Sequence, residues 1–280
     1  MKIDYFGKTD KGKIRKINED YFMAKKVGKE DYLFIVADGM GGHRAGNVAS
    51  KLGTTSFAKE YKTLRRKGIP VTDAMNRAMM KANSAIQKKA AGDQQKQGMG
   101  TTFSAAAILG MNVYLAHVGD SRIYLIRDDR LTRLTTDHTF VGKMVQEGRL
   151  TEDEARDHPQ RNILYMSLGA SQHFEPELGV QVELRNNDIL IMCSDGLNTM
   201  VEESVIKEYA LSYDVKNAVE QLIDLANRNG GVDNVTIQMI QINQKRVTSK
   251  TEPIPIMKMK RDRFSFLKQL FGKTANGINC

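Results

Sequence analysis

The stretch TTFSAAAILGMNVYLAHVGDSRIYLI, residues 101–126, contains three apolar runs separated by two short turns. The runs cover 101–109, 113–118 and 122–126, and each has the length of a β-strand rather than that of a helix. Short turns join antiparallel strands, because a parallel pair needs a crossover of a dozen or more residues. The stretch therefore predicts consecutive antiparallel strands.

Further strand-like runs lie on both sides of this stretch. Residues 32–37 form an apolar run that ends at an Asp-Gly step, and residues 235–242 alternate apolar and polar side chains. We also predict a hairpin in which 180–184 pairs with 189–193 around Asn186-Asn187. These strands follow one another without regular strand-helix alternation, which favours antiparallel sheets over a doubly wound parallel sheet.

Helical spacing of apolar residues is found in four places, namely 45–61, 72–89, 140–147 and 215–228. In the second of these helices we predict Thr72 as the N-cap and Met75, Met79 and Met80 as core residues. Helices covering antiparallel sheets indicate a layered α/β (α+β) sandwich.

The chain has 280 residues and a formal net charge of +9. Nine cations and two acids fall in residues 244–280, so residues 1–243 are close to neutral. We therefore predict one domain over 1–243, with a polar flap at about 135–171, followed by a basic linker and tail. A basic tail without a known motif gives little support for specific nucleic-acid binding.

Several features predict a cytoplasmic protein. No stretch approaches the roughly 18 uninterrupted apolar residues of a membrane-spanning helix, and the N-terminus lacks the apolar run of a signal peptide. Cys193 and Cys280 offer no disulfide framework, which fits a reducing compartment. In the tail, basic residues 258–263 precede the aromatic-apolar segment 264–271. One hypothesis is a peripheral contact with anionic lipid at the inner face of the membrane; the alternatives are a solubilising tail or a protein-docking segment.

Five aspartates lie beside predicted strand ends, and they are Asp20, Asp38, Asp120, Asp195 and Asp233. A single aspartate of this kind is usually a turn or capping residue. If the sheets bring all five together, they would form an oxygen-rich site for magnesium, manganese or calcium, because buried carboxylates need a cation or a partner. The histidines and cysteines have no zinc-site spacing.

Such a site suits attack on phosphorus by a water that two metal ions activate. A cation would still be needed to hold the phosphate. Arg15, five residues before Asp20, could donate two parallel hydrogen bonds to it. The alternative is that Arg15 is an ordinary solvated surface side chain.

Six short motifs follow one another along the chain, namely TDKGKIRKINED (9–20), VADGMGGH (36–43), GMGTT (98–102), HVGDSR (117–122), CSDGL (193–197) and DNVT (233–236). Together and in this order they resemble the motifs of the metal-dependent protein phosphatases of type 2C (PPM), in particular the bacterial serine/threonine phosphatase branch. The resemblance implies a four-layer α-β-β-α sandwich. Its two central antiparallel sheets are flanked by helices, and the metals lie between the sheets at one edge.

The resemblance also implies a cofactor of two Mn²⁺ or Mg²⁺ ions per site. Asp38 would bridge both ions, and the backbone carbonyl of Gly39 would bind one of them. Asp195 and Asp233 would bind the other ion. A third, weaker metal site, to which Asp120 contributes, is present in many bacterial members.

The remaining implied roles concern the substrate. Arg15 would bind the substrate phosphate, and Asp20, supported by Glu19, would act through a metal-bound water, so that Arg15, Asp20 and Asp38 form the catalytic set. The leaving group would receive its proton from His43 or from a metal-bound water.

The function expected from the resemblance is hydrolysis of phosphoserine and phosphothreonine on proteins, by a monomer that opposes a cognate bacterial Ser/Thr kinase. An inactive phosphatase-like binding module is the alternative. Because all five aspartates and Arg15 are present, the enzyme is favoured over that module.

Overall fold

The computed structural model describes residues 2–41, 45–151, 154–155, 158–171 and 174–243. It contains two five-stranded antiparallel sheets. The first runs in the order β1 (Lys2–Asp10), β12 (Val235–Asn243), β11 (Ile189–Cys193), β8 (Arg122–Arg127) and β9 (Arg130–Arg133). The second runs in the order β10 (Glu177–Glu183), β7 (Asn112–Val118), β6 (Phe103–Leu109), β3 (Asp31–Ala37) and β2 (Tyr21–Lys26). A small pair joins β4 (Gly39–Met40) to β5 (Gly100–Thr101).

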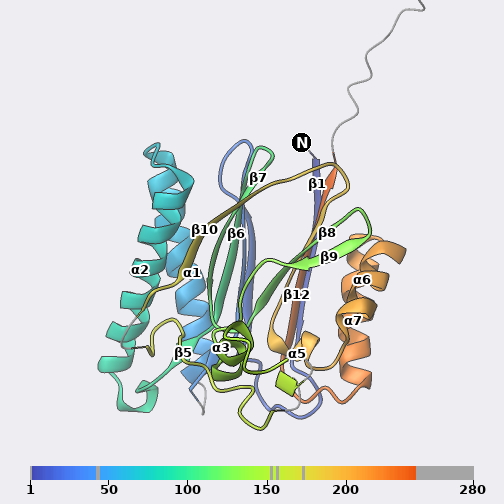
Figure 1. The fold of residues 1–280 in the computed structure, drawn as a ribbon. Coiled ribbons are helices and arrows are strands. Elements are labelled where there is room, and N and C mark those ends of the chain that lie inside the picture. Colours follow the sequence, from blue (N-terminus) through green and yellow to red (C-terminus); the bar gives the residue numbers. More distant parts are fainter. Residues whose placement is uncertain (1, 42–44, 152–153, 156–157, 172–173, 244–280) are drawn as a thin grey trace, which may run out of the picture. The chain divides into compact units, whose positions relative to one another are not determined.

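The helices form the outer layers (Figure 1). Two long helices cover the second sheet, α1 (Ala45–Arg66) and α2 (Val71–Ala91). Two others cover the first sheet, α6 (Glu203–Ser212) and α7 (Val215–Arg228). Shorter elements are η1 (Gln94–Lys96), α3 (Phe140–Gln146) and α5 (Asp195–Asn198). The expected four-layer α-β-β-α sandwich is confirmed.

Three apolar layers hold the sandwich together, and the strands alternate between them. On β3, Leu33 and Ile35 face the α1–α2 layer, whereas Phe34 and Val36 face the other sheet. A strand that is buried on both faces must be apolar at nearly every position. The continuous apolar runs of the central strands are therefore the signature of a position inside the sandwich.

The predicted 180–184/189–193 hairpin is wrong. β10 pairs with β7 at the edge of the second sheet, whereas β11 lies between β8 and β12 in the first. The turn at Asn187, with φ of 69°, carries the chain from one sheet to the other. β11 is buried at all five positions, which suits the centre of a sheet, while β10 is only partly buried, as expected of an edge.

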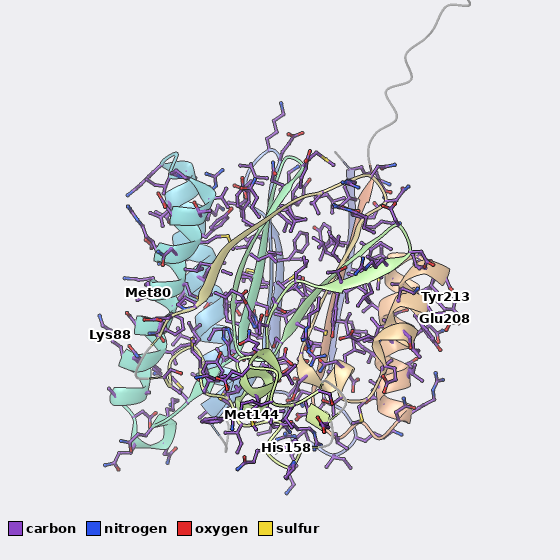
Figure 2. All side chains as sticks on the ribbon, in the orientation of Figure 1. Met80, Lys88, Met144, His158, Glu208 and Tyr213 are labelled. Carbon is purple, nitrogen blue, oxygen red and sulfur yellow. The ribbon has the colours of Figure 1, made fainter. Side chains whose placement is uncertain are left out.

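Two details of α2 also differ from the prediction. The helix begins at Val71 with Pro70 at the N-cap, so Thr72 lies inside the first turn. Met75 and Met79 are buried as predicted, but Met80 is 46% exposed on the outer side of the helix (Figure 2). Residues three and four apart share a helix face, so the position next to Met79 points away from the core.

The described part of the chain has no helix that combines the length and apolar character needed to cross a bilayer. Cys193 is buried, and burial raises the pKa of its thiol to about 12.

Candidate metal centre

Four of the five predicted aspartates lie in loops directly beside strands, and the fold brings those strand ends to one end of the sandwich. Asp20 precedes β2, Asp38 follows β3, Asp120 lies in the turn between β7 and β8, and Asp233 precedes β12. Asp195 follows β11 and opens α5. The pKa of Asp38 is affected by the charges of all four other aspartates, so the five side chains form one electrostatic cluster.

The cluster is poor in compensating charge. Burial, and then the neighbouring carboxylates, raise the pKa of Asp20 to about 7 and that of Asp195 to about 6. Burial also raises the pKa values of Asp38 and Asp120, again with help from like charges. By surface area only Asp20 is fully buried, and the others keep part of their surface open to solvent.

Two carboxylate oxygens of the cluster, Oδ1 of Asp20 and Oδ1 of Asp195, are buried without a hydrogen-bond partner among the described residues. Such a group is costly unless it binds a cation. Carboxylate oxygens without nitrogen or sulfur ligands suit hard ions such as Mg²⁺ and Mn²⁺. The donor set therefore fits the metal ions expected from the sequence.

The orientation of Asp20 is set by two hydroxyl groups. Ser194 Oγ and Thr236 Oγ1 donate to Asp20 Oδ2 at 2.7 and 2.6 Å. Both donors act on one oxygen and leave Oδ1 without a partner. Ser194 and Thr236 belong to the CSDGL and DNVT motifs, but the sequence alone assigns them no role; the available signal is that Ser194 adjoins Asp195 and Thr236 follows Asp233 by three residues.

Asp38 is fixed through its backbone by the two threonines of the GMGTT motif, Thr101 and Thr102. The N–H group of Asp38 donates to Thr102 Oγ1 at 2.9 Å, and the Asp38 carbonyl accepts from the Thr102 N–H group and from Thr101 Oγ1, both at 2.8 Å. The next residue, Gly39, lies so close to Gly46 that a Cβ atom would stand 2.2 Å from the Gly46 carbonyl oxygen. A larger residue than Gly39 would push α1 away from the cluster.

Glu19 supports the site through α1. Its carboxylate accepts from the N–H group of Gly46 at 3.1 Å, and its carbonyl oxygen accepts from Ser50 Oγ at 2.6 Å and from the N–H group of Gly39 at 3.2 Å. Glu19 therefore ties the Asp20 loop to the first turns of α1.

Arg15 interacts electrostatically with three aspartates of the cluster, Asp38, Asp195 and Asp233. Its Nη2 atom lies 2.6 Å from Asp233 Oδ2, and this bond together with the charges of Asp38 and Asp195 raises the pKa of Arg15. The side chain of Arg15 is 51% exposed. A guanidinium at the rim of a carboxylate cluster is placed to meet an anion that arrives from solvent.

A cavity of about 760 Å³ opens beside the cluster. Asp120 and Asp195 line one side of it, and Arg161 and Asn162 of the predicted flap line another. His158, the second flap histidine, is not among its lining residues, and His43 lies outside the described residues.

Comparison with known proteins agrees with this geometry. The protein phosphatase 2C family profile matches residues 13–235. A protein phosphatase 2C-type protein of Streptococcus pyogenes is 41% identical over 244 residues, covering 86% of this chain and 97% of that protein.

Solved structures are also similar. The serine/threonine phosphatase PstP/Ppp of Mycobacterium tuberculosis is 38% identical, with a TM-score of 0.78, over 86% of this chain and 99% of that structure. The catalytic domain of PstP in complex with two manganese ions is 36% identical, with a TM-score of 0.76, over 86% and 99% of the two chains.

The fold and the site thus define a metal-dependent phosphatase. The chain belongs to the protein phosphatase 2C family. The family, fold and enzyme class expected from the sequence, a serine/threonine protein phosphatase of the bacterial branch, are confirmed.

Proposed function

We propose that this chain removes phosphate from phosphoserine and phosphothreonine side chains of proteins, using two Mn²⁺ or Mg²⁺ ions held by the five-aspartate cluster. The observation that carries the proposal is a pair of buried oxygens, one on Asp20 and one on Asp195, that have no hydrogen-bond partner among the described residues and lie within a cluster of carboxylates with raised pKa values. If these carboxylates had only a structural role, their burial without a cation would destabilise the folded protein.

In this proposal Asp38 would hold both ions, and the carbonyl of Gly39 would hold one of them. Asp195 and Asp233 would hold the other. Metal ions at such a site lower the pKa of bound water and screen the phosphoryl oxygens.

The other residues position the reacting groups. Asp20 is aimed by the hydroxyls of Ser194 and Thr236, so that one of its oxygens remains available to the site. Arg15 binds the substrate phosphate, because its half-exposed guanidinium can donate two parallel hydrogen bonds to an oxyanion. Asp120 contributes to a third, weaker metal site.

The cavity beside the cluster is where the substrate chain around the phosphorylated residue would lie. Its walls combine the metal-site residues Asp120 and Asp195 with the flap residues Arg161 and Asn162. We therefore expect the flap to select among phosphoproteins while the cluster performs the chemistry.

The test is hydrolysis of para-nitrophenyl phosphate and of a phosphothreonine peptide, with added Mn²⁺, with added Mg²⁺, and with excess chelator. We expect turnover only with metal, and loss of turnover on chelation. Full activity in excess chelator would contradict the two-metal mechanism.

The partners follow from the same proposal. The substrates are phosphoproteins, with a cognate Ser/Thr kinase among them, and the enzyme acts as a monomer in the cytoplasm. The basic tail, residues 244–280, lies outside the described residues. For this tail we propose peripheral contact with anionic lipid, supported by its charge and by the aromatic-apolar segment 264–271.

The tail proposal can be tested by co-sedimentation of the full chain with anionic vesicles at low salt. Binding should be lost when Lys258, Lys260, Arg261 and Arg263 are changed to Gln, with para-nitrophenyl phosphate turnover unchanged. Equal sedimentation of the two proteins would eliminate the lipid contact.

A further inference from the structure

A second group of ionisable side chains lies beneath the start of the flap. His117 on β7 stands opposite Glu177 on β10 and opposite Ser104 on β6, so the three side chains form a row across neighbouring strands. His138, which precedes α3, lies over this row with its ring centroid 5.0 Å from that of His117. Candidate ligand atoms of His117, His138 and Glu177 lie within 4.8 Å of one another.

The composition of this group is that of a zinc site, but its hydrogen bonds argue for another role. His117 Nε2 lies 3.0 Å from the carbonyl oxygen of Thr136, which can only accept, so this nitrogen carries the proton. His117 Nδ1 then faces the Ser104 hydroxyl at 2.9 Å, and the same hydroxyl lies 3.1 Å from the carbonyl oxygen of Ser121, so its one proton is shared between two acceptors. His138 Nδ1 accepts from the N–H group of Gly119 at 3.2 Å. The lone pair of His138 Nδ1 is therefore already used, and that of His117 Nδ1 faces a hydroxyl group.

His138 holds Gly119 at two points. Besides the ring contact, the N–H group of His138 donates to the Gly119 carbonyl oxygen at 2.8 Å. Gly119 has φ of 104° and lies so close to Thr102 that a Cβ atom would stand 2.6 Å from the Thr102 Cβ atom. Gly119 thus sits between His138 and the threonine that anchors Asp38, and it directly precedes Asp120.

The residue on the other side of Asp120 is also held. Ser121 Oγ lies 2.5 Å from Thr102 Oγ1. Asp120 is therefore flanked by two fixed residues, and one of the two fixing groups is the His138 imidazole. Burial lowers the pKa of His138, which favours the neutral ring that can accept a hydrogen bond.

His138 also contacts the part of the flap that returns toward the sheet. Its carbonyl oxygen accepts from the N–H group of Tyr165 at 3.0 Å, and the two rings lie 5.6 Å apart. One residue thus touches both the Asp120 turn and the flap, whose Arg161 and Asn162 line the same cavity as Asp120.

We propose that His138 is a positioning residue for Asp120: its Nδ1 atom holds the Gly119 peptide and so sets the place of the Asp120 carboxylate in the weaker metal site. The inference rests on the proposed function, in which Asp120 belongs to that site. It assigns a defined atom of a flap residue to the assembly of the metal centre.

The test compares two nearly isosteric replacements. His138→Asn keeps an acceptor oxygen near the position of Nδ1, whereas His138→Leu leaves the N–H group of Gly119 without an acceptor. The same two changes at His158, another flap histidine, whose Nδ1 accepts from the N–H group of Gln160, serve as controls. The measurements are the Mn²⁺ concentration for half-maximal turnover of para-nitrophenyl phosphate, the KM for that substrate at saturating Mn²⁺, and the Mn²⁺-binding isotherm.

For His138→Leu we expect the Mn²⁺ requirement to rise about 10-fold or more, as is typical when an outer-shell partner is lost. Its KM at saturating Mn²⁺ and the affinity of the two tighter ions should stay within about 2-fold of wild type, and His138→Asn should stay within about 3-fold throughout. The thermal midpoint should fall in both variants, because both lose the packed ring. A Mn²⁺ requirement that rises equally in both, or in neither, would overturn the proposal.

If His138→Leu does not fold, His138→Gln takes its place, because its acceptor lies one carbon farther from the backbone. Asn and Gln variants with the same Mn²⁺ requirement would then overturn the proposal. A wild-type chain without Mn²⁺-dependent turnover would contradict the proposed function instead. In that case the Mn²⁺-binding isotherm still tests the positioning role of His138. An unchanged Mn²⁺ affinity of the weakest site in His138→Leu would overturn that role.

Discussion

Two groups of aspartates among the described residues differ in their surroundings. Asp31 accepts from Arg65 Nε at 2.9 Å and from the Tyr61 hydroxyl at 3.0 Å. Asp188 is paired with Arg127, whose Nε and Nη2 atoms lie 3.0 and 2.6 Å from its two oxygens. Each of these two aspartates is therefore paired with an arginine of the same domain.

Within the part of the chain that the structure describes, four carboxylates at the cluster end of the sandwich form no ion pair with an arginine. Burial raises the pKa values of Asp20, Asp38, Asp120 and Asp195, and the charge of at least one other carboxylate raises each of them further. Arg15 is bonded to Asp233 at the rim of the cluster. From this contrast we infer that a bound cation supplies the positive charge at this end of the sandwich.

The largest effect should come from Asp38→Asn, which removes the charge of the proposed bridging ligand. With saturating Mn²⁺ we expect kcat to fall by about 10³-fold or more, beyond the 10–100-fold typical of losing an outer-shell partner. The metal-free protein should become more stable, because one of several mutually repelling carboxylates is gone. Turnover above a tenth of wild type, or lower metal-free stability, would contradict the assignment.

Asp188→Asn should have the opposite profile. It leaves Arg127 partly buried without its anionic partner, so unfolding should become easier by about 3 kcal/mol. The kcat of the folded enzyme and its Mn²⁺ requirement should not change, since Asp188 lies at the start of β11, away from the cluster end of that strand. Chemical denaturation and steady-state kinetics measure the two quantities, and an altered Mn²⁺ requirement would break the comparison.

The pH dependence of stability should reveal the raised pKa of Asp20. In the metal-free protein Asp20 has a pKa of about 7, above its unfolded value near 4, so the folded state binds the extra proton between these values. Stability from this group is therefore present at low pH and lost as pH rises toward 7. His117, with its pKa lowered to about 4, acts in the opposite direction below pH 6.5.

Comparison with Asp20→Asn isolates the Asp20 contribution. In chelator, the thermal midpoint of wild type relative to Asp20→Asn should drop by several degrees from pH 5 to pH 8, since each kcal/mol is about 2–4 °C in a domain of this size. With Mn²⁺ the trend should reverse, because ligands bind metal in their deprotonated form. A metal-free difference that rises with pH would be inconsistent with a raised pKa.

Arg15→Ala should have the smallest effect. Loss of one charge-assisted phosphate contact should raise KM for para-nitrophenyl phosphate about 10-fold, with tight Mn²⁺ binding retained. Arg15→Lys should recover only part of this, because an ammonium cannot form two parallel hydrogen bonds to phosphate. An unchanged KM in Arg15→Ala would return Arg15 to the role of a surface residue paired with Asp233.

The sequence was most informative where strands are buried on both faces. β3, β6, β7, β8 and β11 are largely continuous apolar runs, and Asp38, Asp120 and Asp195 lie next to the ends of four of them, so both could be recognised together. The edge strands β1 and β2 were missed, because their half-exposed residues alternate weakly. The same difference applies to the site. Asp38 and Asp120 could be predicted because they follow apolar strands, whereas the role of Ser194 depends on a hydrogen bond to Asp20, 174 residues away in the chain.

The failed hairpin has a related cause. Pairing of β10 with β7 and of β11 with β8 is decided by which sheet can bury each strand, and a local turn signal at Asn186-Asn187 does not contain that information. The ion pair of Asp188 could not be predicted locally either, because its partner Arg127 lies on β8, 61 residues earlier in the chain.

The central claim is that the five clustered aspartates hold metal ions. A crystal of the full chain soaked in Mn²⁺, with diffraction recorded at the manganese absorption edge, counts these ions directly. We predict two strong anomalous peaks, both in contact with Asp38, with Asp195 and Asp233 on one of them and a weaker third peak at Asp120. An anomalous map without peaks among the five aspartates at millimolar Mn²⁺ would contradict the account.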